Sequence, residues 1–157
     1  MEPKVSRPRF PGYGITESRD GLLPWSWAAE RLAASRNYWI STTRPDGRPH
    51  AMPVWGVWVD DTLYFGSGRE SRKARNLRAS PEVVAHVESG DEVVIIEGVA
   101  EEVIGDEAAE PVNQAYERKY AWRAEAGDPS PLYAVRPRRA FAWREKDYPT
   151  SATRFDF

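Results

Sequence analysis

The chain has 157 residues, 41% of them hydrophobic and 12% aromatic, with a formal net charge of -2 at pH 7. This length allows one domain with a substantial core, and the near-neutral charge argues against general nucleic-acid binding, which needs a broad basic face. The absence of cysteine excludes disulfides, thiolate catalysis and cysteine-based metal sites. No signal sequence or bilayer-spanning apolar run is evident, so we expect a soluble, cytoplasmic protein without a membrane partner.

The first elements are an arm and a helix. Residues 1–21 are rich in Pro, Gly and Arg and show no periodicity, which predicts a flexible arm, either disordered or laid over another surface. Residues 22–157 are expected to form a single domain. Pro24 suits the first turn of a helix that ends near Ser35 to Asn37. The apolar face of this helix is formed by Trp25, Ala28, Ala29 and Leu32.

A hairpin follows the helix. The β-branched and aromatic residues 38–43 lead into Asp46-Gly47, which tolerates the positive φ of a hairpin turn, and the return strand is predicted over residues 50–59. Both faces of the return strand are apolar, which favours a closed barrel or a sheet covered by a second subunit. Pro53 cannot donate to a ladder, so it indicates a sheet edge or contact with something other than a strand.

A second tight turn, at Asp60-Asp61, leads into a third strand, so the sequence predicts a three-stranded meander. After this strand come a glycine-rich turn and a short amphipathic helix that ends at Ser80-Pro81. Five basic residues fall between Arg69 and Arg78, some of them in the first turns, where the helix already has positive potential. An anion such as a phosphate would complete this site; the alternative is a solvated basic helix face.

The C-terminal half is predicted to begin with two strands, at residues 83–87 and 93–103. A helix at residues 106–122, a loop at residues 127–131 and a final strand at residues 132–143 follow. Gly98 interrupts the second of these strands, which predicts a bulge or bend that can close a small barrel. The helix is expected to restart at Pro111, and the last strand to bend at Arg136-Pro137.

Catalytic side-chain motifs are not evident. His50 and His86 lack the spacing of metal ligands, so we predict no metal site. The run Gly66 to Ser71 resembles a dinucleotide fingerprint but does not lie in a βαβ unit. If the protein is an enzyme, a bound cofactor is therefore expected to carry the chemistry.

Three segments, in this order, carry a family resemblance: Gly47-Arg48-Pro49-His50 with the strand to Trp55, Leu63-Tyr64-Phe65, and Ser71-Arg72-Lys73 at the helix start. The combination resembles the pyridoxamine 5'-phosphate oxidase-like family of flavin-binding proteins, and it covers residues 25–103 well. The resemblance implies a mainly β fold with α elements: a split β-barrel of about six antiparallel strands with short flanking helices. It also implies a homodimer with cofactor clefts between the subunits.

The family pattern implies where the cofactor binds. Its phosphate would lie on Ser71, Arg72 and Lys73, and its sugar-alcohol chain beside Gly66 and Ser67. The ring would lie along Met52, Pro53, Val54 and Trp55. His50 and Asn76 are further candidates, each with a structural role as the alternative. No catalytic residue is assigned.

The implied function is an oxidoreductase that uses FMN, as first choice, or the deazaflavin coenzyme F420 on a small organic substrate. The longer anionic tail of F420 is weakly favoured by the spare cations Arg69, Arg75 and Arg78. The vitamin B6 enzymes have a flavin-gripping arginine-rich strand without a counterpart here, so vitamin B6 oxidation is not expected. The alternative is a non-catalytic binder or carrier of flavin, haem or a tetrapyrrole, with His50 as the first haem-ligand candidate.

Overall fold

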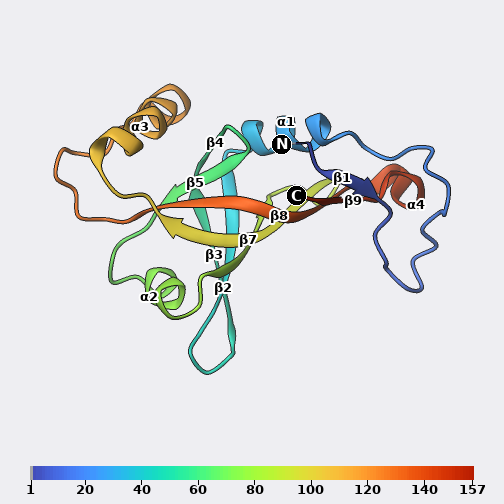
Figure 1. The fold of residues 1–157 in the computed structure, drawn as a ribbon, viewed down its shortest axis with the longest axis horizontal. Helices are drawn as coiled ribbons and strands as arrows, with labels where there is room; N and C mark the ends of the chain where they lie inside the picture. Colours follow the sequence, from blue (N-terminus) through green and yellow to red (C-terminus); the bar gives the residue numbers. More distant parts are fainter. Residues whose placement is uncertain (1) are drawn as a thin grey trace.

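Over residues 2–157, the computed structural model contains nine strands, four α-helices and one short 3-10 helix (Figure 1). The helices are α1 (Trp25–Ala34), α2 (Arg72–Ala79), α3 (Asp106–Tyr120), the 3-10 turn η1 (Glu145–Asp147) and α4 (Tyr148–Ser151). The strands are β1 (Lys4–Ser6), β2 (Asn37–Thr43), β3 (Pro49–Trp55), β4 (Val57–Val59), β5 (Thr62–Gly66), β6 (Glu82–Val87), β7 (Glu92–Glu102), β8 (Leu132–Arg144) and β9 (Thr153–Asp156).

The strands form one antiparallel sheet in the order β1-β9-β8-β7-β6-β2-β3, with β5 paired to β8 and β4 paired to β5. The predicted mainly β fold with short flanking helices is confirmed. Among the described residues there are nine strands, where about six were predicted, because the arm and the C-terminal tail each add a short strand and the predicted return strand divides in two.

The division of the return strand occurs at Gly56. A side chain at this position would meet the Tyr38 ring at 2.9 Å and the Tyr64 carbonyl at 3.0 Å, so the chain can pass between them only as glycine. β3 remains paired with β2, whereas β4 pairs only with β5. The predicted three-stranded meander is therefore wrong, because no single middle strand pairs with both β2 and β5. The tight turn after β4 is confirmed, with positive φ angles of 49° and 54° at Asp60 and Asp61.

The core lies inside the curled sheet. The largest fully buried side chains include Tyr38 and Ile40 of β2, Phe65 of β5 and Phe155 of β9. Both α1 and α2 contribute buried side chains to the same cluster, and α3 packs outside it against β4 through Val112 and its neighbours. In Figure 1, α2 and α3 accordingly lie on different sides of the sheet.

The bend predicted at Gly98 is confirmed. The β7–β8 pairing shifts between Glu97 and Gly98, and Arg138 of β8 is the extra residue at the shift. A side chain at Gly98 would lie 2.5 Å from the Arg136 carbonyl oxygen. β8 is nonetheless one continuous strand through Pro137, and α3 likewise continues through Pro111 instead of restarting there.

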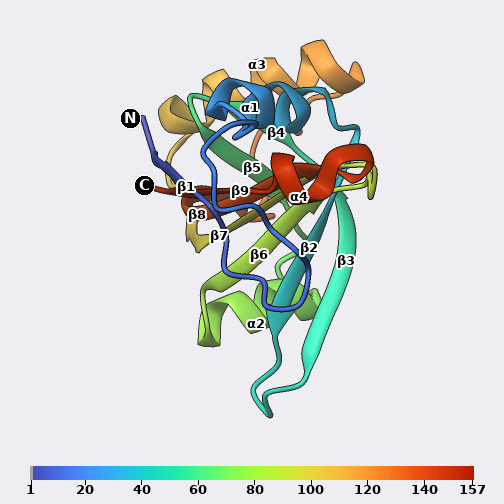
Figure 2. The same ribbon diagram turned by 90° about the vertical axis from the view of Figure 1, so that its right-hand side faces the viewer.

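The N-terminal segment lies against the domain. β1 pairs with β9, as Figure 2 shows, and the Arg7 guanidinium donates hydrogen bonds to four backbone carbonyls, those of Ser18, Asp20, Thr150 and Ala152. The Phe10 ring packs 5.4 Å from the ring of Phe141. The N-terminal segment is therefore laid over the surface of its own chain. None of the described helices is long and apolar enough to cross a membrane.

Candidate functional site

The start of α2 brings two hydroxyl groups together. Ser71 is the N-cap of the helix, and its Oγ accepts a hydrogen bond from the Ala74 amide at 3.1 Å. The Oγ of Ser67 lies 2.7 Å from the Oγ of Ser71. The Ser67 amide donates to the Pro131 carbonyl at 3.1 Å, which fixes the turn against the segment before β8. Both hydroxyls therefore lie at the positive end of a helix.

Arg72 and Lys73 form the first turn of the same helix. Among residues 2–157, no carboxylate makes an ion pair with either of them. Lys73 is half-buried, and this burial lowers the pKa of its ammonium group. A partly desolvated cation without a counter-ion favours the binding of an anion. The predicted anion site thus has the charge and the hydroxyl donors that it requires.

His50 lies on the same face of the sheet as α2. It is directly opposite Thr42 in the β2–β3 pair, and the Thr42 Oγ1 accepts a hydrogen bond from the Asn76 Nδ2 of α2 at 3.0 Å. Asn76 is fully buried. The Asn76 side chain thus joins α2 to β2 and positions the start of the helix. This is a structural role, the alternative to cofactor binding that was given for Asn76.

The surroundings of His50 are positive. Burial lowers the pKa of its imidazole, and the charges of Arg44, Lys73 and Arg72 lower it further. Its Nδ1 is buried and has no hydrogen-bond partner among the described residues. A buried polar atom in that state requires an explanation, and a polar or anionic ligand bound beside it would provide one. Arg44 was missed by the sequence analysis, although its place in the hairpin that carries His50 could have indicated it.

The four residues predicted to lie along the ring do not share one face of β3. Met52 and Val54 lie on the same side as His50, whereas Pro53 and Trp55 lie on the opposite side beside Trp39. This follows from the two-residue period of a strand. The predicted edge position of Pro53 is confirmed, because β3 is the last strand of the sheet. Met52 and Trp55 are 46% and 41% exposed, so this edge is open in the single chain.

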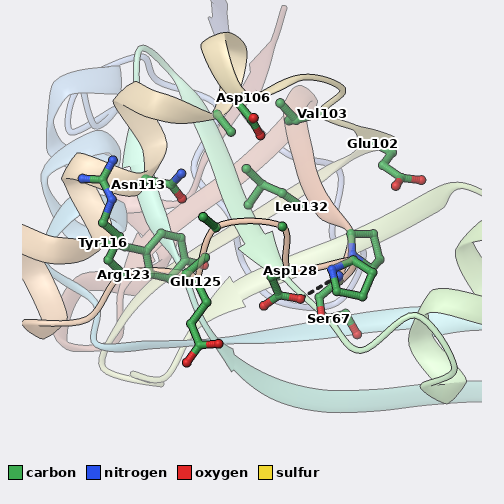
Figure 3. Close-up of a pocket in the computed structure, with 18 of the residues that line it drawn as sticks. Ser67, Glu102, Val103, Asp106, Asn113, Tyr116, Arg123, Glu125, Asp128 and Leu132 are labelled. Atoms are coloured by element: carbon green, nitrogen blue, oxygen red, sulfur yellow. Dashed lines mark hydrogen bonds between the residues drawn. The ribbon is translucent and has the colours of Figure 1, made fainter.

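A hollow of about 760 Å³ adjoins the other end of this region (Figure 3). We call it the α3 hollow: it lies between the end of β5, α3 and the loop of residues 121–131. Gly66, Ser67 and Trp55 line it, as do Tyr116 of α3 and Leu132 of β8. Ser67 therefore lies both at the hollow and at the start of α2, so the two sites are neighbours.

The C-terminal half of α3 holds the end of β3. The Lys119 Nζ donates to the Gly56 carbonyl and to the Tyr38 hydroxyl, at 2.8 Å each. Burial, and to a smaller extent the charge of Arg36, lowers the pKa of Lys119 to about 8. A contact between α3 and a glycine 63 positions away has no short-range sequence signal, so it could not be predicted from the sequence.

The spare cations predicted to reach a cofactor tail are mostly engaged elsewhere. Arg69 pairs with Glu102 at 3.1 Å and donates to the Pro129 carbonyl. Arg78 donates to the Arg69 carbonyl at 3.3 Å. Arg75 is exposed and makes no ion pair within residues 2–157. In the same residues, no three His, Asp or Glu side chains gather to hold a metal ion.

The curled antiparallel sheet, with an open edge strand and a cationic helix start, defines a split β-barrel with a candidate anion-binding site. The family model described as pyridoxamine 5'-phosphate oxidase matches residues 27–145, and the chain belongs to this family. The resemblance inferred from the sequence is thus confirmed. No curated protein matches the chain significantly.

Solved structures share the fold. The conserved hypothetical protein Rv2991 from Mycobacterium tuberculosis is 25% identical, with a TM-score of 0.71 over 87% of this chain and 90% of that one. A structure described as an F420 reductase is 23% identical, with a TM-score of 0.55 over 69% and 90% of the two chains. HutZ from Vibrio cholerae, described as a haem storage protein, is 18% identical, with a TM-score of 0.59 over 69% and 85%.

Proposed function

We propose that this protein binds a phosphate-bearing flavin-type cofactor, FMN as first choice or coenzyme F420, and acts as an oxidoreductase on a small organic molecule. The observation that carries the proposal is the start of α2. There the unpaired Arg72 and the half-buried Lys73 lie beside two hydroxyls, and His50 adds an unpartnered buried nitrogen. Family membership supports the proposal, since the matched region includes this helix.

The residues fit the phosphate end of such a cofactor. The hydroxyls of Ser67 and Ser71 and the side chains of Arg72 and Lys73 would hold the phosphate. When bound, the flavin or deazaflavin ring would supply the hydride-transfer chemistry, and the protein would orient it and exclude water. The exposed edge of β3, with Met52, is the surface proposed to lie along the ring.

A homodimer belongs to the same proposal. On the face of β3 away from α2, Trp39 and Trp55 are 38% and 41% exposed, with Pro53 also exposed between them in register. Large apolar side chains grouped on a sheet face favour a protein contact. A second copy covering this face would bury them and close the cleft over the ring edge.

The alternative function is haem or tetrapyrrole carriage, and one observation favours it. The unpartnered nitrogen of His50 could ligate an iron, and the cations near it could pair with the acidic groups of a tetrapyrrole. The likeness to HutZ supports the fold only.

The experiment that tests the proposal is a fluorescence titration of purified apo-protein with FMN and, separately, with coenzyme F420. We expect one of them to bind in the micromolar range or tighter. Lys73→Ala and Arg72→Ala should each weaken FMN binding by about tenfold, or ~1.4 kcal/mol. Arg75→Ala is the matched control for FMN, because it removes the same charge from an exposed position of the same helix.

Equal losses in the control and test variants would refute the phosphate site. If neither cofactor binds but haem does, with a Soret band that changes in His50→Ala, the carrier alternative replaces the proposal. If a cofactor binds and is reduced by NADH or NADPH, reoxidation by an organic acceptor separates an oxidoreductase from a carrier.

A further inference from the structure

The α3 hollow has an aromatic wall. The rings of Trp55 and Tyr120 are stacked with their centroids 4.4 Å apart, Tyr120 lies 5.6 Å from Tyr116, and Tyr116 lies 5.8 Å from Trp122. Three of the four rings line the hollow. Trp122 is 47% exposed, so its ring has surface available to a ligand.

The charge of the hollow is negative. Its lining contains five carboxylate residues and two arginines: Glu102, Asp106, Glu110, Glu125, Asp128, Arg69 and Arg123. Both arginines are already engaged, Arg69 by Glu102 at 3.1 Å and Arg123 by Glu110 and by Glu117.

Three carboxylates of the lining are left without a cation. Within residues 2–157, Asp106, Glu125 and Asp128 make no ion pair. Asp128 accepts a hydrogen bond from the Ser130 amide at 2.8 Å. This bond lowers the pKa of the Asp128 carboxyl group and so favours its charged form. Figure 3 shows these carboxylates on α3 and on the loop that faces it.

The hollow is therefore opposite in sign to the neighbouring start of α2. The cationic site takes the anionic end of a cofactor, and the α3 hollow would repel a second anion. The aromatic wall provides apolar surface and negative ring faces, both of which attract an organic cation. The Arg36 guanidinium already lies 5.6 Å from the Trp55 ring centroid and 5.4 Å from that of Tyr120, so this ring pair accepts a cation on the surface that Arg36 covers.

We propose that the α3 hollow binds an organic cation with a planar aromatic body, such as a quaternary or protonated heteroaromatic amine. The volume of about 760 Å³ is in the range of pockets for drug-sized molecules. Trp55 and Ser67 link the hollow to the proposed cofactor cleft. The role of this cation as the substrate rests on the proposed oxidoreductase function, whereas its binding requires only the hollow.

The test uses three probes that share the quinoline ring system and differ in charge: 1-methylquinolinium, neutral quinoline and quinoline-4-carboxylate. Each is titrated into the apo-protein by isothermal titration calorimetry. We expect the cation to bind at least tenfold more tightly than the carboxylate, and its affinity to fall as salt is added. Trp122→Ala should weaken both the cation and neutral quinoline.

Charge-neutralising variants separate electrostatics from shape. The double change Asp106→Asn with Glu125→Gln should weaken 1-methylquinolinium at least threefold and leave neutral quinoline unchanged. Glu107→Gln is the control for the Asp106→Asn change, since this carboxylate is in the same helical turn as Asp106 but does not line the hollow.

No cation binding at millimolar concentration, equal affinities for cation and anion, or equal effects in test and control variants would overturn the proposal. The FMN titration is read independently of these probes. Cation binding without binding of either FMN or coenzyme F420 would retain this site and refute the proposed function; binding of either cofactor without cation binding would do the reverse.

Discussion

The Trp55 indole and the Tyr120 phenol ring lie face to face, with centroids 4.4 Å apart and planes 5° from parallel. The Tyr120 oxygen accepts a hydrogen bond from the Gly56 amide at 3.0 Å and lies 2.6 Å from the Arg36 carbonyl oxygen. One residue of α3 thus fixes both the side chain and the backbone at the end of the edge strand. The position of Trp55 in the lining of the α3 hollow depends on this contact.

Tyr120→Phe should keep the stack and lose the hydroxyl contacts. We expect the free energy of unfolding to fall by about 1–3 kcal/mol, because buried backbone groups at Gly56 lose a partner. Urea denaturation measures the change. Tyr13→Phe is the control, since Tyr13 is 66% exposed and its hydroxyl makes no hydrogen bond in the described part of the chain. A similar loss in both variants would mean that the clamp does not stabilise the fold.

The two hydroxyls at the start of α2 should differ in their effects. Ser71→Ala removes the N-cap and should cost about 1 kcal/mol of stability, together with a loss of FMN affinity. Ser67→Ala leaves the cap intact, so it should weaken FMN binding with a smaller effect on unfolding. Thermal denaturation and FMN titration of both variants check this. If Ser67→Ala leaves FMN affinity unchanged, its hydroxyl does not contact the phosphate.

Lys119 should make stability depend on pH. Its pKa is lowered to about 8, whereas a lysine in the unfolded chain titrates near ~10.4. Between about pH 8 and 10 the unfolded state therefore binds the proton more tightly, and folding stability contributed by this group rises with pH. The advantage of the natural protein over Lys119→Met should grow across this window in urea denaturation. Parallel pH profiles for the two proteins would contradict the shifted pKa.

Gly98→Ala should destabilise the β7–β8 pair. The added methyl group would lie 2.5 Å from the Arg136 carbonyl oxygen, and relief of such a contact costs roughly 1–3 kcal/mol. Gly90→Ala is the control, because it meets nothing within 4 Å and has no positive φ. Equal unfolding midpoints for both variants would show that the bulge has room for a side chain.

Local sequence signals predicted most of the fold. The turn at Asp60-Asp61 and the helix at residues 72–79 depend on residues close in sequence, and Gly98 is itself the local signal for its bend; the structure has all three. The break at Gly56 was missed because its cause is the Tyr38 ring, 18 positions away in the chain. The pairing of β1 with β9 depends on a contact between the two chain ends, which no local pattern indicates.

The candidate site could be predicted in part for the same reason. Ser71, Arg72 and Lys73 are consecutive, so their charge pattern is visible in the sequence, and the structure keeps them together at one helix start. The α3 hollow brings the end of β5 next to the loop of residues 121–131. A site assembled from distant segments requires the tertiary structure.

Two prolines on β3 limit how this sheet can grow. Pro49 and Pro53 lie on the last strand of the sheet, and proline on an edge is tolerated where its missing N–H would face outward. The other two outer strands, β1 and β4, are only three residues long each. None of these margins offers a full row of donors to an incoming strand. Copies of this chain are thereby discouraged from joining into a continuous ribbon, and any association must be selected by matching side-chain surfaces.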